Sequence, residues 1–243
     1  MKTKTILSVI LCLVFSMGLQ AQRNTVLIFQ DYSGSVKANE NHIAKQKTVL
    51  KTILLKHIQK PNDRVIVSYL FHNSASVTNQ REFVFENPTK REAKTKVETT
   101  RQKSQLLRAK FRFITNVLQA FETRQKRSHQ TRILEAIPKI HALAGDKDTL
   151  KIIFLSDMLE SSPRRELSRI NSKLDAETKA KYDAQRIIND FGISKVKYPN
   201  ITIDCYLPLG MMENQTAYQF LNFYWTTVFK IVFDTENLKF HIL

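Results

Sequence analysis

TVLIFQDYSGS, residues 25–35, joins an apolar run to a polar cluster. The first half, Thr25 to Phe29, is almost continuously apolar, which is typical of a strand buried on both faces of a sheet. The second half, Gln30 to Ser35, is polar and contains a glycine, so the chain is expected to turn there. We predict a central strand of a parallel sheet, with polar side chains gathered at its carboxyl end.

Apolar runs and helical periodicities alternate along the rest of the chain. Further strands are predicted at residues 64–71, 81–85, 150–155 and 201–207, and helices at residues 41–60, 106–121, 131–143, 163–191 and 217–232. Alternation of this kind favours parallel strands connected by helices that cover both faces of the sheet. The expected fold class is therefore α/β: a three-layer α/β/α, doubly wound, mostly parallel sheet, formed by residues 22–243 as one domain.

The first 21 residues differ in character from the rest. Lys2 and Lys4 precede a short apolar run, Ile6 to Phe15, and Ala21 offers a small residue for cleavage. This pattern is typical of a secretory signal peptide, although an uncleaved membrane anchor is the alternative. No later segment resembles a transmembrane helix. We expect residues 1–21 to be removed and the mature chain to be exported, to the periplasm, the cell surface or the medium.

The remaining chain is strongly basic. Removing Lys2 and Lys4 lowers the formal net charge from +16 to +14. Such a surface favours anionic partners, either acidic proteins or anionic cell-surface polymers. Nucleic acid is disfavoured, because the cations are scattered over several helices without interleaved aromatic residues on one strand face. Residues 87–105 are almost entirely polar, so we expect an exposed insertion there, as a solvated loop or a helical extension.

Oxygen-bearing side chains occur where ligands usually bind in such a sheet, beyond the carboxyl ends of the strands. Asp31, Ser33 and Ser35 follow the first strand, Thr131 precedes a predicted helix, and Asp157 follows the strand at residues 150–155. Hydroxyl and carboxylate oxygens are the donors that Mg²⁺ prefers. A loop motif of one Asp and two Ser is common, but its order with Thr131 and Asp157 behind it is more specific.

These five residues match the metal-ion-dependent adhesion site of von Willebrand factor A domains, which the chain resembles over residues 24–233. The resemblance implies that Ser33, Ser35 and Thr131 ligate the ion directly, while Asp31 and Asp157 act through waters. It also implies Mg²⁺, or Mn²⁺ or Ca²⁺, as cofactor, and a protein partner that supplies an acidic residue.

The chain departs from the family pattern in two places. His129 and Gln130 stand where relatives typically have small glycines before the threonine, and Met158 stands where glycine is frequent after the aspartate. The alternative hypothesis is therefore a scaffolding domain that binds no metal. It would retain these residues as turn and cap formers and bind anionic polymers or partners through its basic surface.

Catalysis is not expected. The sequence has no nucleophile elbow, phosphate-binding loop or dinucleotide-binding glycine pattern, and its six histidines lack the paired spacing of a zinc site. An aspartyl phosphatase would need a second carboxylate two residues after Asp31, where this chain has Ser33. The aromatic residues of the last helix, around Trp225, have the spacing of core packing, with a partner surface as the alternative.

Overall fold

Six strands form one mostly parallel sheet in the described part of the structure, which is a computed structural model. The structure describes residues 23–31, 40–71, 74, 80–89, 93–122, 129–144, 149–163, 165–194, 198–208 and 215–243. The strands are β1 (Asn24–Asp31), β2 (Arg64–Leu70), β3 (Gln80–Val84), β4 (Thr149–Leu155), β7 (Ile201–Leu207) and β8 (Leu238–Ile242). They lie in the order β3-β2-β1-β4-β7-β8, and β3 is antiparallel to β2.

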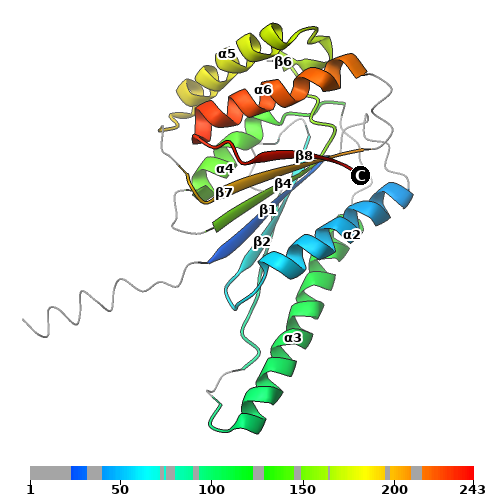
Figure 1. Cartoon of the computed structure of the whole chain (residues 1–243), viewed down its shortest axis with the longest axis vertical. Coiled ribbons are helices and arrows are strands. Elements are labelled where there is room, and N and C mark those ends of the chain that lie inside the picture. Colours follow the sequence, from blue (N-terminus) through cyan, green and yellow to red (C-terminus); the bar gives the residue numbers. More distant parts are fainter. Residues whose placement is uncertain are drawn as a thin grey trace, which may run out of the picture.

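Helices cover both faces of this sheet, so the predicted three-layer α/β fold class is confirmed (Figure 1). One face packs against α4 (Ile137–Ala144), α5 (Lys173–Phe191) and α6 (Gln215–Phe233). The other face packs against α2 (Glu40–His57) and α3 (Lys96–Gln119). Short 3-10 turns are η2 (Ala120–Glu122), η3 (Leu134–Ala136) and η4 (Leu167–Arg169), and a small hairpin consists of β5 (Ser161–Ser162) and β6 (Arg165–Glu166).

Alternation along β1 supplies the core on both sides of the sheet. Leu27 and Phe29 belong to the cluster under α4, α5 and α6, whereas Val26 and Ile28 belong to the cluster under α2 and α3. All four side chains are fully buried. Burial of apolar surface stabilises the fold by about 25 cal/mol per Å². A strand that is apolar on both faces gains this stabilisation on both sides only when helices cover both faces of the sheet.

The aromatic residues of α6 pack mainly inward, as the core-packing interpretation predicted. Tyr224, Trp225 and Phe229 are fully buried, and the ring of Phe229 lies 6.0 Å from that of Phe154 on β4. Cys205 on β7 is also fully buried.

Several elements differ from the sequence prediction. Residues 131–133 are not helical: the 3-10 turn η3 and then α4 follow them, and Pro138 lies in the first turn of α4. Helix α5 begins at Lys173, ten residues later than predicted: β6 and η4 precede it, Ser172 is its N-cap, and Gly192, with φ 61°, is its C-cap. Strand β8 was not predicted, and α3 begins at Lys96, so residues 96–105, for which a loop or a helical extension was expected, are helical.

Within the described ranges, no helix has both the length and the apolar character required to cross a bilayer. The predicted signal peptide, residues 1–21, lies outside the described residues.

Candidate functional site

The strand order places the topological switch point between β1 and β4. The chain leaves β1 toward β2 on one side and β4 leads toward β7 on the other, which is the position where ligands usually bind in a sheet of this kind. The register pairs Gln30 with Leu155. Asp31 and Ser156 therefore lie side by side where the two strands end.

A short hydrogen-bond chain joins these strand ends. The Ser156 hydroxyl donates to Oδ2 of Asp31 at 2.5 Å and accepts from the backbone N–H of Met158 at 3.0 Å. Ser156 is buried, and Asp31 is only 7 % exposed. A hydrogen bond to a carboxylate is about twice as strong as one between neutral groups, so Ser156 holds the Asp31 side chain at the switch point.

Asp157 lies in a tight turn that follows β4. Its side chain is fully buried, and its Oδ1 accepts from the backbone N–H of Leu159 at 2.9 Å. The next residue, Met158, has φ 59°, in the left-handed region that favours glycine. A glycine would adopt this conformation without strain, whereas a methionine must be held in it.

Met158 is held in that conformation by its surroundings. Its carbonyl accepts from the indole N–H of Trp225 at 2.9 Å, and its side chain is fully buried in the cluster beneath α6. A non-glycine residue in the left-handed region costs about 1–2 kcal/mol, which these contacts offset. The methionine side chain therefore serves the core.

Thr131 is joined to the segment that follows Asp157. Its backbone N–H donates to the Ser161 hydroxyl at 3.0 Å, and its carbonyl accepts from the Ser161 N–H at 2.9 Å. The Thr131 side chain is 1 % exposed. The connection of Thr131 to the two aspartates thus runs through residues 157–161.

Glu160 strengthens this connection. Its Oε2 accepts from the backbone N–H groups of Ile133 at 2.5 Å and Leu134 at 3.0 Å, which are the first N–H groups of the turn leading into α4. Glu160 is fully buried. Burial raises the pKa of its carboxyl group from an ordinary 4.5 to about 8, although the two backbone N–H groups partly oppose that increase.

A tyrosine of α6 adds to the surroundings of Asp157. The pKa of Tyr218 is raised, first by burial of its phenol and then by the negative charge of Asp157. Sequence analysis did not find Tyr218, Ser156, Glu160 or Ser161. Ser156 had one visible signal, its position directly before Asp157 at a strand end, whereas the other three act through contacts that depend on the tertiary fold.

The described part of the predicted site fits a hard divalent cation in its donor chemistry. Asp31, Thr131 and Asp157 all offer oxygen: the two aspartates lie at neighbouring strand ends, and the backbone of Thr131 is hydrogen-bonded to Ser161, four residues after Asp157. Ser33 and Ser35 lie outside the described residues. No group of three or more His, Cys, Asp and Glu suited to a metal occurs among the described residues, and a hydroxyl-rich site would not form such a group.

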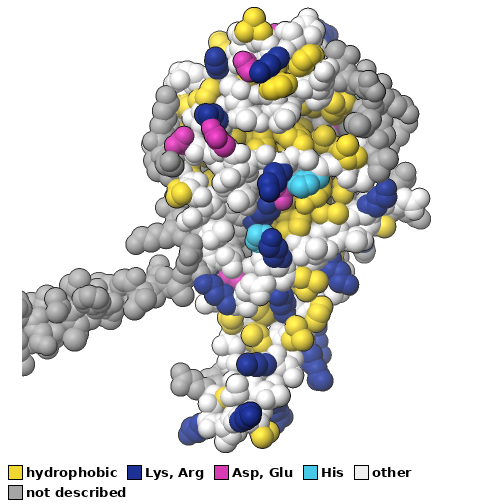
Figure 2. Space-filling model, in the orientation of Figure 1, with side chains coloured by type: hydrophobic (Ala, Val, Ile, Leu, Met, Phe, Trp, Pro, Cys, Tyr) yellow, Lys and Arg dark blue, Asp and Glu magenta, His cyan; other side chains and the backbone are white. Residues whose placement is uncertain are grey.

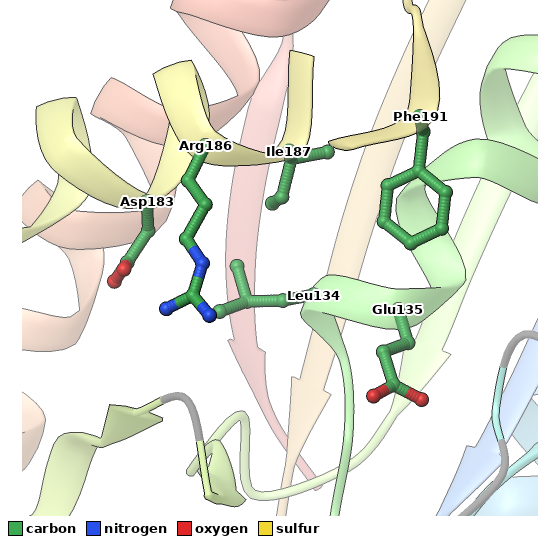
Figure 3. Close-up of a pocket in the computed structure, with 6 residues that line it drawn as sticks. All are labelled: Leu134, Glu135, Asp183, Arg186, Ile187 and Phe191. Carbon is green, nitrogen blue, oxygen red and sulfur yellow. The ribbon is translucent and has the colours of Figure 1, made fainter. Parts of the chain in front are cut away.

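A small pocket lies elsewhere, between η3 and α5 (Figure 3). It is lined by Leu134, Glu135, Asp183, Arg186, Ile187 and Phe191. Both oxygens of Asp183 accept hydrogen bonds from Arg165, at 2.5 Å and 2.8 Å, and one also accepts from Tyr224 at 2.7 Å. Because its carboxylate is engaged in this way, Asp183 serves as an internal anchor for the surrounding elements.

No protein-family model matches the sequence, and no curated protein is similar to it. Among solved structures, the chain is similar to proximal thread matrix protein 1 from the mussel byssus, with 8 % identity and a TM-score of 0.40 over 90 % of this chain and 43 % of that one. It is also similar to a von Willebrand factor type A protein from Catenulispora acidiphila, with 14 % identity and a TM-score of 0.39 over 92 % of this chain and 39 % of that one. The chain spans less than half the length of each of these proteins.

Proposed function

We propose that the chain is an exported binding module that engages an acidic residue of a protein partner through a divalent cation. The cation would be held at the switch point by Asp31, Ser33, Ser35, Thr131 and Asp157. Mg²⁺ fits this oxygen donor set best, with Mn²⁺ or Ca²⁺ as substitutes. The role is one of binding, without a chemical step.

One observation carries the proposal. The hydrogen bond from Ser156 to Asp31 fixes a carboxylate at the end of β1 beside the turn that contains Asp157 at the end of β4. Two buried carboxylates on neighbouring strand ends are costly unless cations or hydrogen bonds compensate their charge. A divalent cation would add to the hydrogen bonds that Asp31 and Asp157 already accept.

The protein's own groups would set the geometry of binding. Ser156 orients Asp31, the Leu159 N–H orients Asp157, and Ser161 positions the backbone of Thr131. A bound cation would supply positive charge and an open coordination position for a carboxylate of the partner. The basic surface would increase the rate at which an acidic partner arrives.

Isothermal titration with Mg²⁺ and with Mn²⁺ tests this proposal. The unaltered chain should bind one ion with measurable heat, and Asp31→Asn should weaken binding by about tenfold or more because it removes one of the two charges. Asn keeps an oxygen that can accept from Ser156, so the variant should fold. Asp190→Ala, which removes a carboxylate on α5, is the matched control and should bind like the unaltered chain.

Equal heats for the unaltered chain and Asp31→Asn would overturn the metal claim. Partner binding that ignores chelators and weakens steeply with salt would instead favour the scaffolding alternative.

A further inference from the structure

Helix α3 extends beyond the body of the molecule (Figure 1). Its C-terminal half packs under the sheet, where Ile114 and Val117 are buried and the ring of Phe113 lies 5.5 Å from that of Phe85. Its N-terminal half, residues 96–105, is exposed at every position except the half-buried Gln102. We call residues 96–112 the arm.

The arm is helical for local reasons. Thr95 is the N-cap and accepts from the N–H of Glu98, while the Glu98 carboxylate accepts from the N–H of Thr95. Such a capping box contributes about 1 kcal/mol or more to a helix that has little tertiary packing. The helix therefore presents its side chains in a defined pattern.

The charge of α3 is strongly one-sided. The helix carries six cationic residues and one carboxylate, that of Glu98, which is engaged in the capping box. The cations are Lys96, Arg101, Lys103, Arg108, Lys110 and Arg112. Lys110 donates to the carbonyl of Leu55 on α2 at 2.7 Å, so it helps to fasten the arm. The other cations lie on exposed residues.

Exposed apolar side chains lie beside these cations. Val97 is 79 % exposed, Leu107 53 % and Phe111 45 %. At 100° per residue they fall within about 80° of one another on the helix, and Arg101, Arg108 and Arg112 fall on the adjoining strip of about 40°. The packed residues Leu106, Ala109 and Phe113 occupy the opposite side. Figure 2 shows Lys and Arg gathered over the projecting helix, with hydrophobic side chains among them.

We propose that the arm is a docking surface for an anionic lipid bilayer. Cations and apolar side chains on one outward face match a bilayer surface, which offers anionic headgroups with hydrocarbon directly beneath them. Val97, Leu107 and Phe111 would enter the headgroup region while the arginines contact phosphates. A soluble anionic polymer would leave the three apolar side chains in water, and an acidic protein would need an apolar groove shaped for this convex helix. The bilayer needs no such shape.

This surface is separate from the strand-end site, because α3 packs on the face of the sheet opposite to α4 and α6. Lipid binding by the arm requires no divalent cation and should persist in a chelator. The two proposals can therefore fail independently.

Co-sedimentation of the chain with vesicles tests the proposal. The probe is vesicles with about one third phosphatidylglycerol in phosphatidylcholine, compared with pure phosphatidylcholine, in a chelator. The chain should bind the anionic vesicles only. The triple variant Arg101→Gln, Arg108→Gln, Arg112→Gln should lose about tenfold or more in binding. A matched triple variant elsewhere, Arg169→Gln, Lys181→Gln, Lys239→Gln, has the same loss of charge on exposed residues and should lose about twofold or less.

The apolar side chains of the arm distinguish binding to a lipid bilayer from binding to a soluble anionic polymer. Leu107→Gln with Phe111→Gln should reduce vesicle binding by about fivefold or more and leave binding to soluble polyphosphate unchanged. Leu174→Gln with Tyr182→Gln, at 75 % and 62 % exposed positions of α5, is the control and should change neither. Equal loss in both triple variants, or no loss in the Leu107 and Phe111 variant, would overturn the proposal. The second result would identify the arm as a polymer site.

Discussion

At the level of single residues, Glu160 fixes the position of the segment that carries Thr131. A single carboxylate oxygen accepts from two consecutive backbone N–H groups at the start of the turn into α4. Those N–H groups have no partner within the helix, and a buried helix start needs one. The cost is that a carboxyl group sits in a fully buried position, with a pKa raised to about 8.

We predict that Glu160 makes the protein less stable as pH rises from about 5 to about 8. Over this range the folded state keeps a proton on Glu160, whereas the unfolded state, with a pKa near 4.5, has released it. Since the folded state binds more protons, raising the pH favours unfolding, and the effect is on the order of a few kcal/mol. Urea unfolding at several pH values measures it.

In the variant Glu160→Gln, the free energy of unfolding should lack the decrease that Glu160 causes between about pH 5 and pH 8. Gln keeps an acceptor for the N–H groups of Ile133 and Leu134 but does not titrate. Glu177→Gln on α5 is the control and should keep the pH dependence of the unaltered chain. Two parallel curves for Glu160→Gln and the unaltered chain would contradict the prediction.

Sequence reasoning found Asp31 and Asp157 because each directly follows an apolar run, and the carboxyl end of a strand is a position that a sequence reveals. It could not find Glu160 or Ser161. Their partners, Ile133 and Thr131, are 27 and 30 residues away, and only the folded chain brings them together.

At the element scale, the hairpin of β5 and β6 is fastened to two helices. Arg165 on β6 forms two hydrogen bonds to Asp183 on α5, and Tyr224 on α6 donates to the same carboxylate. Asp183 has a side chain only 1 % exposed. The side-chain hydrogen bond to Asp183 raises the pKa of the Arg165 guanidinium, which therefore stays charged. The same hairpin carries Ser161, which positions Thr131.

Replacing Asp183 with Ala should destabilise the protein by about 3–5 kcal/mol, because the half-buried guanidinium of Arg165 and the buried phenol of Tyr224 both lose their acceptor. Urea unfolding followed by Trp225 fluorescence measures the change. Asp190→Ala, whose carboxylate is 38 % exposed and lies 3.7 Å from Arg186, is the control on the same helix and should change stability by less than about 0.5 kcal/mol. A loss below about 1 kcal/mol for Asp183→Ala would show that the network contributes little.

The elements that sequence reasoning placed well are those with a strong apolar period, such as β7, whose bounds match the predicted residues 201–207. Strand β6 was assigned to a helix and β5 was not predicted, because each of these strands has two residues, too few to show an alternation. Strand β8 was missed for a related reason: Leu238, Phe240 and Ile242 alternate with polar residues over only five positions.

For the whole molecule, the fold class followed from the alternation of strand and helix along the chain, and the sheet confirms it. The projection of α3 beyond the body of the molecule could not be predicted from this alternation. Its first ten residues have no apolar period to predict a helix, and its capping box, Thr95 with Glu98, was the only local sign of where it begins. The result is a molecule with two separate candidate surfaces, one at the carboxyl edge of the sheet and one on a basic arm.

The central claim is that five oxygen-bearing side chains surround one divalent ion at the switch point. Crystals of the chain soaked in Mn²⁺ test it most directly, since Mn²⁺ prefers the same oxygen donors as Mg²⁺ and gives an anomalous signal. The account predicts one anomalous peak enclosed by Asp31, Ser33, Ser35, Thr131 and Asp157. No peak at that position, or a Thr131 hydroxyl directed away from both aspartates, would contradict it.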